Sequence, residues 1–381
     1  MLKKFISTAL ISVLSLSLML TGCGNSTKTT SGDAAQSGTT ANQTAKKDFV
    51  VGFIYVGHVN DGGWTSAHNE GRLQVENELK SQGVKTIIKE AVPEGPEAEK
   101  VMKDMIDQGA KIIFATSFGY MDYMEKVAKE FPDVKFMHCS GFKTAANMSN
   151  YFGRIYQARY LSGIVAGMKT KSKKIGYVAA FDIPEVVRGI NAFTLGVRSV
   201  NPDAKVVVNW TNTWYDPAKE KDAANALLTQ GCDVIAQHQD TTGPQVAAEE
   251  KGAFAIGYNT DSKNAAPKAY MTAPIWNWGP YYVSQVKAAM DGTWKSESYW
   301  KGMDSGIVKL APLTAVAPAD AKAKVEELQK KIIDGSFEPF TGPIKDQTGA
   351  EKVKAGQKMS DKELLSFDWF VEGVEGKINK K

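Results

Sequence analysis

The chain has 381 residues, of which 43% are hydrophobic and 23% are charged. This length and composition are ordinary for a soluble globular protein and are sufficient for two domains. The formal net charge of +4 falls to +2 when the two lysines of the N-terminal segment, Lys3 and Lys4, are removed. A balance this close to neutrality argues against nucleic acid as a partner.

The N-terminus has the pattern of an export signal. Lys3 and Lys4 precede an apolar run over residues 5–20, which is too short to span a membrane. The run ends in Leu-Thr-Gly-Cys23, which resembles a bacterial lipobox. Residues 1–22 are therefore predicted to be a lipoprotein signal peptide, with Cys23 as the lipid-bearing residue that attaches the protein to the membrane. The alternative is an ordinary secretory signal with an incidental cysteine.

Small and polar residues fill the stretch after Cys23, and they predict a flexible tether over residues 23–47. Two further cysteines, Cys139 and Cys232, each lie within or next to an apparent strand, far apart in the sequence. Exported proteins can form disulfides, but two buried thiols in separate lobes are the prediction for these cysteines.

Strands and helices are predicted to alternate along the first part of the chain. An apolar, β-branched and aromatic stretch predicts a first strand, and a Gly-rich loop follows it. The predicted strands are 49–56, 84–90, 111–116 and 134–139, and the predicted helices are 64–82, 96–108, one ending near 131, and 154–169. This alternation predicts a parallel, doubly wound α/β sheet with right-handed crossovers.

The same alternation of strands and helices restarts after a lysine-rich break at residues 169–174, which is the predicted boundary between two lobes. Strands are predicted at 174–180, 205–210, from 233, 254–258, 269–273 and 306–310, and helices from 184 to about 200, at 217–230, up to 252, at 281–290 and at 318–334. Residues 48–170 with about 291–344 are assigned to the N-terminal lobe, and residues 171–290 to the C-terminal lobe. The lysine-rich tail over 345–381 is left unplaced.

Six predicted strand ends contain a carboxylate, amide or hydroxyl group, and five of the six also contain an aromatic ring. These residues are Asn60, Asp61 and Trp64; Ser117, Phe118 and Tyr120; Phe181 and Asp182; Trp214 and Asp216; Gln239, Asp240 and Thr241; and Tyr258, Asn259 and Asp261. The carboxyl ends of parallel strands share one side of a sheet, so two facing lobes would form a cleft lined by ring faces and hydrogen-bond acceptors.

Such a cleft suits a flat heterocycle with N–H donors on its edge. Stacking contributes about 1–3 kcal/mol per base face, and a hydrogen bond to a charged group about 1.5–3 kcal/mol. Two rings and one carboxylate therefore reach the roughly 8 kcal/mol of micromolar binding, before ordering costs are counted.

Each candidate also has a structural interpretation. Asp61 is equally a helix N-cap, and Asp122 and Asp216 are still more plainly caps and are left out of the site. Trp64 could belong to the core, as could the rings of the candidates Phe118, Phe181 and Tyr258. His68 follows Trp64 by one helical turn and is either a cleft-lining donor or a core histidine.

Catalytic and metal-binding patterns are absent from the sequence. It contains no Gly-x-Ser-x-Gly elbow, no Cys-x-x-Cys pair and no His-x-x-x-His helix, and its four histidines are scattered. Gly163 and Gly167 approach a phosphate-loop pattern but have the wrong spacing and lie within a helix, so they indicate small-residue helix packing. Neither an enzymatic activity nor a cofactor nor a metal is expected.

Several motifs together resemble the basic membrane protein family of bacterial substrate-binding lipoproteins. They are the lipobox, Val51-Gly52-Phe53-Ile54 with Asn60-Asp61-Gly62-Gly63-Trp64, residues 116–122, residues 132–136, residues 212–219 and Trp294-Lys295. The resemblance covers about residues 48–344. It implies a periplasmic-binding-protein type I fold with two lobes joined by a hinge, capture of a purine, and delivery to an ABC permease at the outer face of the cell membrane.

The resemblance also implies roles for single residues. In the nucleoside-binding branch of the family, the base stacks between two aromatic residues at the positions of Trp64 and Trp214, and an acid at the position of Asp261 holds the ligand. That branch has a sugar-binding lysine near Ile275 and Trp276, where this chain has none. We therefore expect a nucleobase such as adenine rather than a nucleoside, with Trp276 among the site residues.

Alternatives from other classes remain open. A nucleoside hydrolase would turn over adenosine and would need a calcium-based or histidine-based site that the sequence does not contain. A ligand-sensing lipoprotein would share the fold and dock on a receptor instead of a permease. Riboflavin or another flat heterocycle would also satisfy a stacking site.

Overall fold

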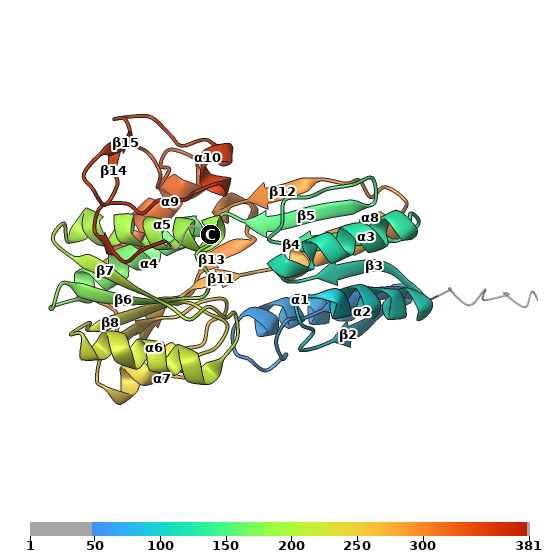
Figure 1. Cartoon of the computed structure of the whole chain (residues 1–381), viewed down its shortest axis with the longest axis horizontal. Helices are drawn as coiled ribbons and strands as arrows, with labels where there is room; N and C mark the ends of the chain where they lie inside the picture. Colours follow the sequence, from blue (N-terminus) through green and yellow to red (C-terminus); the bar gives the residue numbers. More distant parts are fainter. Residues whose placement is uncertain (1–47, 379–381) are drawn as a thin grey trace, which may run out of the picture. The chain divides into compact units, whose positions relative to one another are not determined.

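The first sheet contains six parallel strands in the order β12-β5-β4-β3-β1-β2 (Figure 1). It belongs to a computed structural model that describes residues 48–378. The predicted signal peptide, the tether and Cys23 lie outside the described residues. The strands are β1 (Phe49–Ile54), β2 (Val84–Lys89), β3 (Ala110–Ala115), β4 (Lys135–Cys139), β5 (Met148–Gly153) and β12 (Ser298–Lys301).

Two pairs of helices cover the faces of this sheet. They are α1 (Trp64–Leu79), α2 (Pro96–Asp107), α3 (Met121–Glu130) and α8 (Gly279–Met290), with short 3-10 turns η1 (Lys80–Gln82) and η2 (Phe118–Tyr120). Along β1, Phe53 packs with the cluster formed by α1 and α8, and Ile54 with the cluster formed by α2 and α3. Burial on both faces explains why the central strands are almost continuously apolar.

The second sheet has the order β10-β9-β8-β6-β7-β16 and is also parallel. Its strands are β6 (Lys174–Ala179), β7 (Lys205–Trp210), β8 (Val234–His238), β9 (Phe254–Ile256), β10 (Tyr270–Thr272) and β16 (Val374–Glu375). Its helices are α4 (Tyr156–Lys169), α5 (Pro184–Val200), α6 (Pro217–Thr229), α7 (Gly243–Glu250), α9 (Ala321–Ile333) and α10 (Asp361–Leu365), with the 3-10 turn η3 (Met303–Ser305). The two parallel sheets confirm the predicted α/β architecture of two doubly wound lobes.

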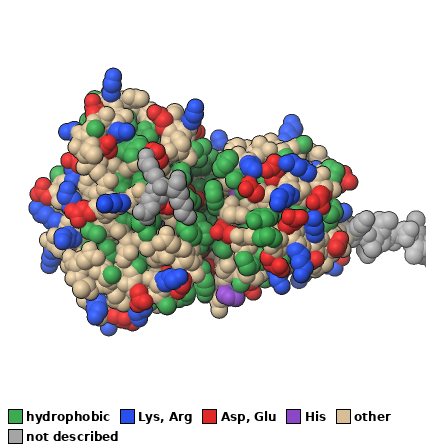
Figure 2. Space-filling model, in the orientation of Figure 1, with side chains coloured by type: hydrophobic (Ala, Val, Ile, Leu, Met, Phe, Trp, Pro, Cys, Tyr) green, Lys and Arg blue, Asp and Glu red, His purple; other side chains and the backbone are tan. Residues whose placement is uncertain are grey.

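Two antiparallel pairs complete the structure. They are β11 (Pro274–Trp276) with β13 (Val308–Leu310), and β14 (Ile344–Lys345) with β15 (Glu351–Val353). On the face drawn in Figure 2, positive and negative side chains are interspersed and apolar side chains gather between the two lobes. None of the helices within residues 48–378 combines the length and the apolar character needed to cross a membrane.

The lobe boundaries differ from the prediction at three places. Helix α4, assigned by the boundary at residue 170 to the N-terminal lobe, packs against α5 and so covers the second sheet. Helix α8, inside the predicted range 171–290, packs against α1 on the first sheet. Helix α9, predicted to pack on the N-terminal lobe, contacts α4 and so lies on the C-terminal lobe, whereas β12 from the same predicted range joins the first sheet. A helix pattern shows that one face is buried but not which sheet buries it.

Glycines explain the close contact between α4 and α5. A methyl group on Gly163 would lie 2.1 Å from the carbonyl oxygen of Phe193, and one on Gly196 would lie 2.0 Å from that of Tyr160. Only a hydrogen atom fits between these backbones. The interpretation of Gly163 and Gly167 as packing residues, rather than a phosphate loop, agrees with this geometry.

The C-terminal segment, left unplaced by the sequence, is part of the second lobe. Strand β16 adds to the edge of the sheet beside β7, and α10 packs on α5. Phe340, Phe367 and Phe370 are buried there. Cys139 and Cys232 are both free and buried, on the first and second lobes respectively, as predicted.

Candidate ligand-binding site

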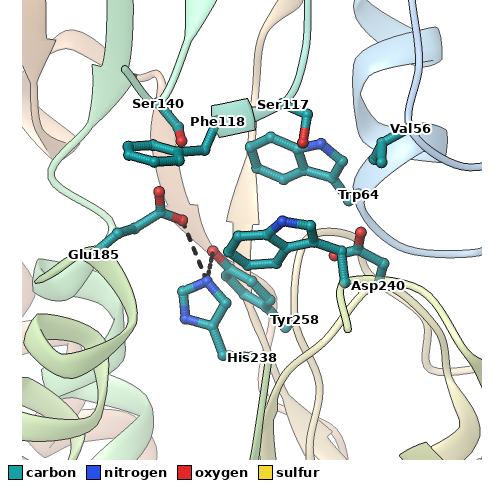
Figure 3. A pocket seen from close by; sticks show the side chains of 10 residues that line it. Val56, Trp64, Ser117, Phe118, Ser140, Glu185, His238, Asp240 and Tyr258 are labelled. Carbon is teal, nitrogen blue, oxygen red and sulfur yellow. Dashed lines mark hydrogen bonds and ion pairs between the residues drawn. The ribbon is translucent and has the colours of Figure 1, made fainter. Parts of the chain in front are cut away.

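A cavity lies between the lobes, at the carboxyl ends of the parallel strands (Figure 3). Its empty space amounts to about 300 Å³, which includes space open to solvent. The position matches the edge at which open α/β sheets bind ligands. Both lobes contribute to its wall. The lining residues are Val56, Trp64, Ser117, Phe118, Ser140, Glu185, Trp214, His238, Asp240 and Tyr258.

Trp64 forms a rigid part of the wall on the N-terminal lobe. It is the first residue of α1, and its indole N–H donates a hydrogen bond of 2.7 Å to the carbonyl oxygen of Thr116 at the end of β3. The rings of His68, Trp276 and Trp278 pack edge-on against it. Because these contacts fix the ring, Trp64 presents a preformed aromatic surface to the cavity.

Trp214 comes from the C-terminal lobe, in the loop between β7 and α6, and lines the same cavity as Trp64. It is half-buried, and the ring of Phe181 meets it edge-on at 5.0 Å between centroids. Asp216, two residues later, accepts a hydrogen bond from the backbone N–H of Lys219 and caps α6. The cap fixes the end of the loop that carries Trp214.

The cavity wall includes the buried carboxyl group of Asp240. Asp240 follows β8, is only 4% exposed, and accepts no hydrogen bond at its side-chain oxygens from any residue in the range 48–378. Burial raises the pKa of this carboxyl well above its ordinary value, and the nearby carboxylates of Asp61, Glu220 and Glu185 add to the effect. A buried carboxyl without a protein partner is costly unless a ligand satisfies it.

Glu220 of α6 positions the loop that bears Asp240. Its carboxylate accepts hydrogen bonds from the backbone N–H and the hydroxyl of Thr241, at 3.1 and 2.6 Å, and from the backbone N–H of Asp216. Burial raises the pKa of Glu220 to about 7, against the opposing effect of these hydrogen bonds. One side chain therefore ties the two strand-end loops of the second lobe together.

A chain of polar contacts forms the side of the cavity near α5. Glu185 Oε1 lies 3.3 Å from His238 Nε2, and the hydroxyl of Tyr258 lies 3.4 Å from the same nitrogen (Figure 3). Burial lowers the pKa of His238 to about 4, so this histidine is neutral near pH 7 and donates to Glu185 as a neutral imidazole. Behind Tyr258, the guanidinium of Arg159 lies 3.6 Å from the ring centroid.

The structure brings some of the predicted site residues together and not others. The cavity is lined by Trp64, Ser117, Phe118, Trp214, Asp240 and Tyr258. Asp61 lies close to it, but its carboxylate accepts hydrogen bonds from the backbone N–H groups of Gly63, Thr65 and Ser66, so it shapes the start of α1. Phe181 supports Trp214.

Four predicted residues are placed elsewhere. Asn60 and Asp261 are exposed, and Asp261 pairs with Lys263 at 3.2 Å rather than facing the cavity. His68 is fully buried, stacks on Trp278 and bonds to the Tyr282 hydroxyl. Trp276 stacks on Trp278 and donates to Asn259 Oδ1. The last two belong to an aromatic layer behind Trp64.

Sequence reasoning missed Val56, Ser140, Glu185 and His238. Glu185 and Ser140 each follow a strand of the sheets, so the rule that located Trp64 and Trp214 could have found them. His238 is the last residue of β8, two positions before Asp240. Within residues 48–378, no group of three or more His, Cys, Asp or Glu side chains is arranged to hold a metal ion.

Comparisons with known proteins agree with this architecture. Residues 49–339 match the family model Bmp, described as ABC transporter substrate-binding protein PnrA-like. The chain is 47% identical to a purine-binding protein of Brucella abortus, over 88% of this chain and 95% of that one. It is 36% identical to a putative ABC transporter glucose-binding protein of Haloferax volcanii, over 92% and 84% of the two chains.

Solved structures show the same fold. An ABC transporter solute-binding protein from Conexibacter woesei superposes with a TM-score of 0.63 at 25% identity, over 76% of this chain and 98% of that one. One from Aeropyrum pernix gives 0.67 at 20% identity, over 84% and 98%. These neighbours confirm the predicted type I periplasmic-binding fold.

Substrate-binding proteins of ABC transporters bind a small molecule outside the cytoplasm and act with an ABC permease. The family match over residues 49–339 and the relative at 47% identity lead to one conclusion. This chain belongs to the Bmp family of PnrA-like ABC transporter substrate-binding proteins.

Proposed function

We propose that this protein captures a purine base, adenine in the first place, and delivers it to an ABC permease. The observation that carries the proposal is Asp240, a buried carboxyl with no partner among the described residues, in a cavity that Trp64 and Trp214 also line. Rings favour a flat ligand, and the carboxyl needs a hydrogen-bonding edge. The name of the Brucella abortus relative supports the same ligand class.

The state of Asp240 favours adenine over guanine. Because burial raises its pKa, the carboxyl retains its proton more readily and then carries one donor and one acceptor. The edge of adenine offers the complementary pair, the N6 amino donor and the N7 acceptor, whereas the same edge of guanine offers two acceptors. A neutral Asp240 carboxyl can therefore accept a hydrogen bond from the N6 amino group of adenine with one oxygen and donate one to N7 with the other.

The lining of the cavity favours a base over a nucleoside. A lysine that could hold ribose does not line the cavity. This observation agrees with the expectation drawn from the missing sugar-binding lysine.

A sugar is the second candidate ligand, since the Haloferax volcanii relative is named as a putative glucose-binding protein. A hexose would need partners for several hydroxyl groups. In this cavity the hydroxyl of Ser117 already donates to Glu94 at 2.6 Å, and Glu185 is paired with His238. The polar set is too small for a hexose, which makes the purine the better match.

Isothermal titration of the purified protein with adenine, hypoxanthine, guanine, adenosine, riboflavin and glucose tests the assignment. We expect adenine to bind with a dissociation constant of about 1 μM or below, in line with about 8 kcal/mol of binding energy. Binding heat with glucose or riboflavin, but with none of the purines, would overturn the assignment. Mass spectrometry of a copurifying molecule gives an independent answer, and a chromatographic assay for adenosine cleavage tests the non-enzymatic role.

We further propose that the protein is a lipoprotein held at the outer face of the cell membrane through Cys23. The proposal rests on the lipobox pattern that ends at Cys23. Replacing this residue by alanine should move the protein from the membrane fraction to the soluble fraction after export. An unchanged membrane fraction would contradict the anchor.

Permease and receptor partners are distinguished by crosslinking the ligand-bound protein in the membrane.

A further inference from the structure

A second chamber adjoins the base cavity. Phe118, Ser140 and Glu185 line both spaces, so the two lie next to each other. The chamber has a volume of about 730 Å³, part of it open to solvent. Strands β5 and β12 of the first lobe form one side of it, and α10 with the start of α5 forms the other. A substituent on a ligand seated against Asp240 could therefore extend toward this chamber.

The wall of this chamber is mostly apolar and aromatic. It includes Phe152 from β5, Tyr299 and Trp300 from β12, and Leu365 at the end of α10. Two of the polar side chains in the wall have protein partners, whereas the buried indole N–H of Trp300 has none among residues 48–378. The Ser298 hydroxyl donates to Asn150 Oδ1 at 2.8 Å, and Asn150 Nδ2 lies 3.4 Å from the Lys143 carbonyl oxygen.

Arg188 is the cationic residue of the wall. It is 2% exposed, donates a hydrogen bond of 2.7 Å to the carbonyl oxygen of Leu364, and lies 5.2 Å from the centroid of the Trp300 ring. The carboxylate of Glu185 lines the same chamber and offsets its charge. An anionic group entering here would meet Glu185 together with Arg188, so the chamber is not a dedicated anion site.

Two exposed apolar side chains mark the rim. Phe142, after β4 on the first lobe, is 70% exposed, and Leu365 on the second lobe is 52% exposed. They belong to different lobes and line the same space. An apolar group held between them would remove both from water, and the free energy gained grows with the apolar area buried.

We propose that this chamber accepts an apolar substituent on the purine, so that the preferred ligands include adenines extended by an aromatic or aliphatic group. The inference rests on the proposed purine-binding function and deepens it. A ribose fits the chamber less well, because its several hydroxyl groups would leave water for a wall that is mostly apolar and aromatic.

Competition titration tests this assignment with adenine, adenosine, adenosine monophosphate, N6-benzyladenine and 9-benzyladenine. The two benzyl compounds extend the base from different edges, so they cover either orientation of the base. We expect at least one of them to bind about tenfold or more tightly than adenosine, a difference of about 1.4 kcal/mol. The variant Leu365→Asp should weaken that compound about fivefold or more while leaving adenine unchanged, since apolar burial at the rim is lost.

Ile333→Asp provides the matched control, because Ile333 is another exposed apolar residue of the second lobe, 44% exposed, and does not line the chamber. Tighter binding of adenosine than of both benzyl compounds would overturn the inference in favour of ribose. Tightest binding of the monophosphate would overturn it in favour of an anion at Arg188. Equal effects of the two variants would also overturn it. Failure of every purine, adenine included, would instead refute the proposed function itself.

Discussion

Substituting Asp240 by asparagine and by alanine separates the two hydrogen-bonding states of this side chain. Asparagine keeps one donor and one acceptor, as a protonated carboxyl does, and removes the charge. Alanine removes both. If adenine binds the neutral carboxyl through two hydrogen bonds of about 0.5–1.5 kcal/mol each, Asp240→Ala should weaken binding by about 1–3 kcal/mol, or about five-fold to 150-fold.

Asp240→Asn should stay within about threefold of the wild type for adenine, because its amide can turn to present either order of donor and acceptor. The pH dependence supplies a second readout. Wild-type affinity for adenine should fall as the pH rises through the raised pKa of Asp240, because the proton that donates to the ligand is lost. The affinity of the asparagine variant should show no such fall.

The unliganded protein gives a third readout. A carboxyl whose pKa is raised by folding destabilises the folded state once the pH exceeds its ordinary value of 3.8. Asp240→Asn should therefore raise the melting temperature near pH 7 and leave it unchanged near pH 3. Titration calorimetry with adenine between pH 5 and pH 9, together with thermal unfolding, provides these measurements. An asparagine variant as weak as the alanine variant would refute the reasoning and assign an ionised carboxylate to the ligand.

Further predictions concern the walls and the supporting structure. Trp214→Ala should weaken adenine binding by about 1–3 kcal/mol with little change in the melting temperature of the apo protein. Trp64→Ala should lower both the adenine affinity and the apo melting temperature, because Trp64 also bonds to Thr116 and packs on Trp278. Trp210→Ala, outside the cavity, is the control for titration, and equal apo stability of the two site variants would contradict the prediction. Phe370 is 2% exposed, so Phe370→Ala should lower the free energy of unfolding, measured with denaturant, by about 3–5 kcal/mol. Adenine affinity should be unchanged. A stability equal to wild type would show that the C-terminal segment is not docked. Burial raises the pKa of Glu220 from 4.5 to about 7, so one component of the apo protein's stability should decline as the pH rises across this interval. Glu220→Gln should remove this component. Identical pH profiles of wild type and variant in thermal unfolding would refute the assignment.

The sequence was sufficient for the architecture, because burial of central strands on both faces leaves a strong local signal. Apolar runs such as 51–54 and 112–115, each followed by a helical pattern, are required by any parallel sheet covered on both faces. The same reasoning placed Trp64 and Trp214 together although they lie far apart in the chain. Strand ends of one sheet must share an edge, so position within the pattern located them.

Contacts that join distant segments were decided only in three dimensions. Strands β5 and β12 contain polar residues and lack the apolar pattern, so pairing along the sheet edge defines them. Helix α4 could have covered either sheet, and close glycine contacts with α5 settle which one it covers. The two-residue strand β16 exists because β7 offers an unpaired edge, a fact that no local pattern contains.

The direction of each side chain at the strand ends was likewise a tertiary property. Asp240 and Asp261 both follow strands and are equivalent in a sequence pattern. Asn259 adopts a positive φ of 70°, and its side chain is held by Trp276 and lies near the Gln239 carbonyl oxygen, so the chain turns away from the cavity before it reaches Asp261. Residue type and spacing fix which chemistry reaches the edge of a sheet, whereas loop conformation and packing decide which groups point into the cavity.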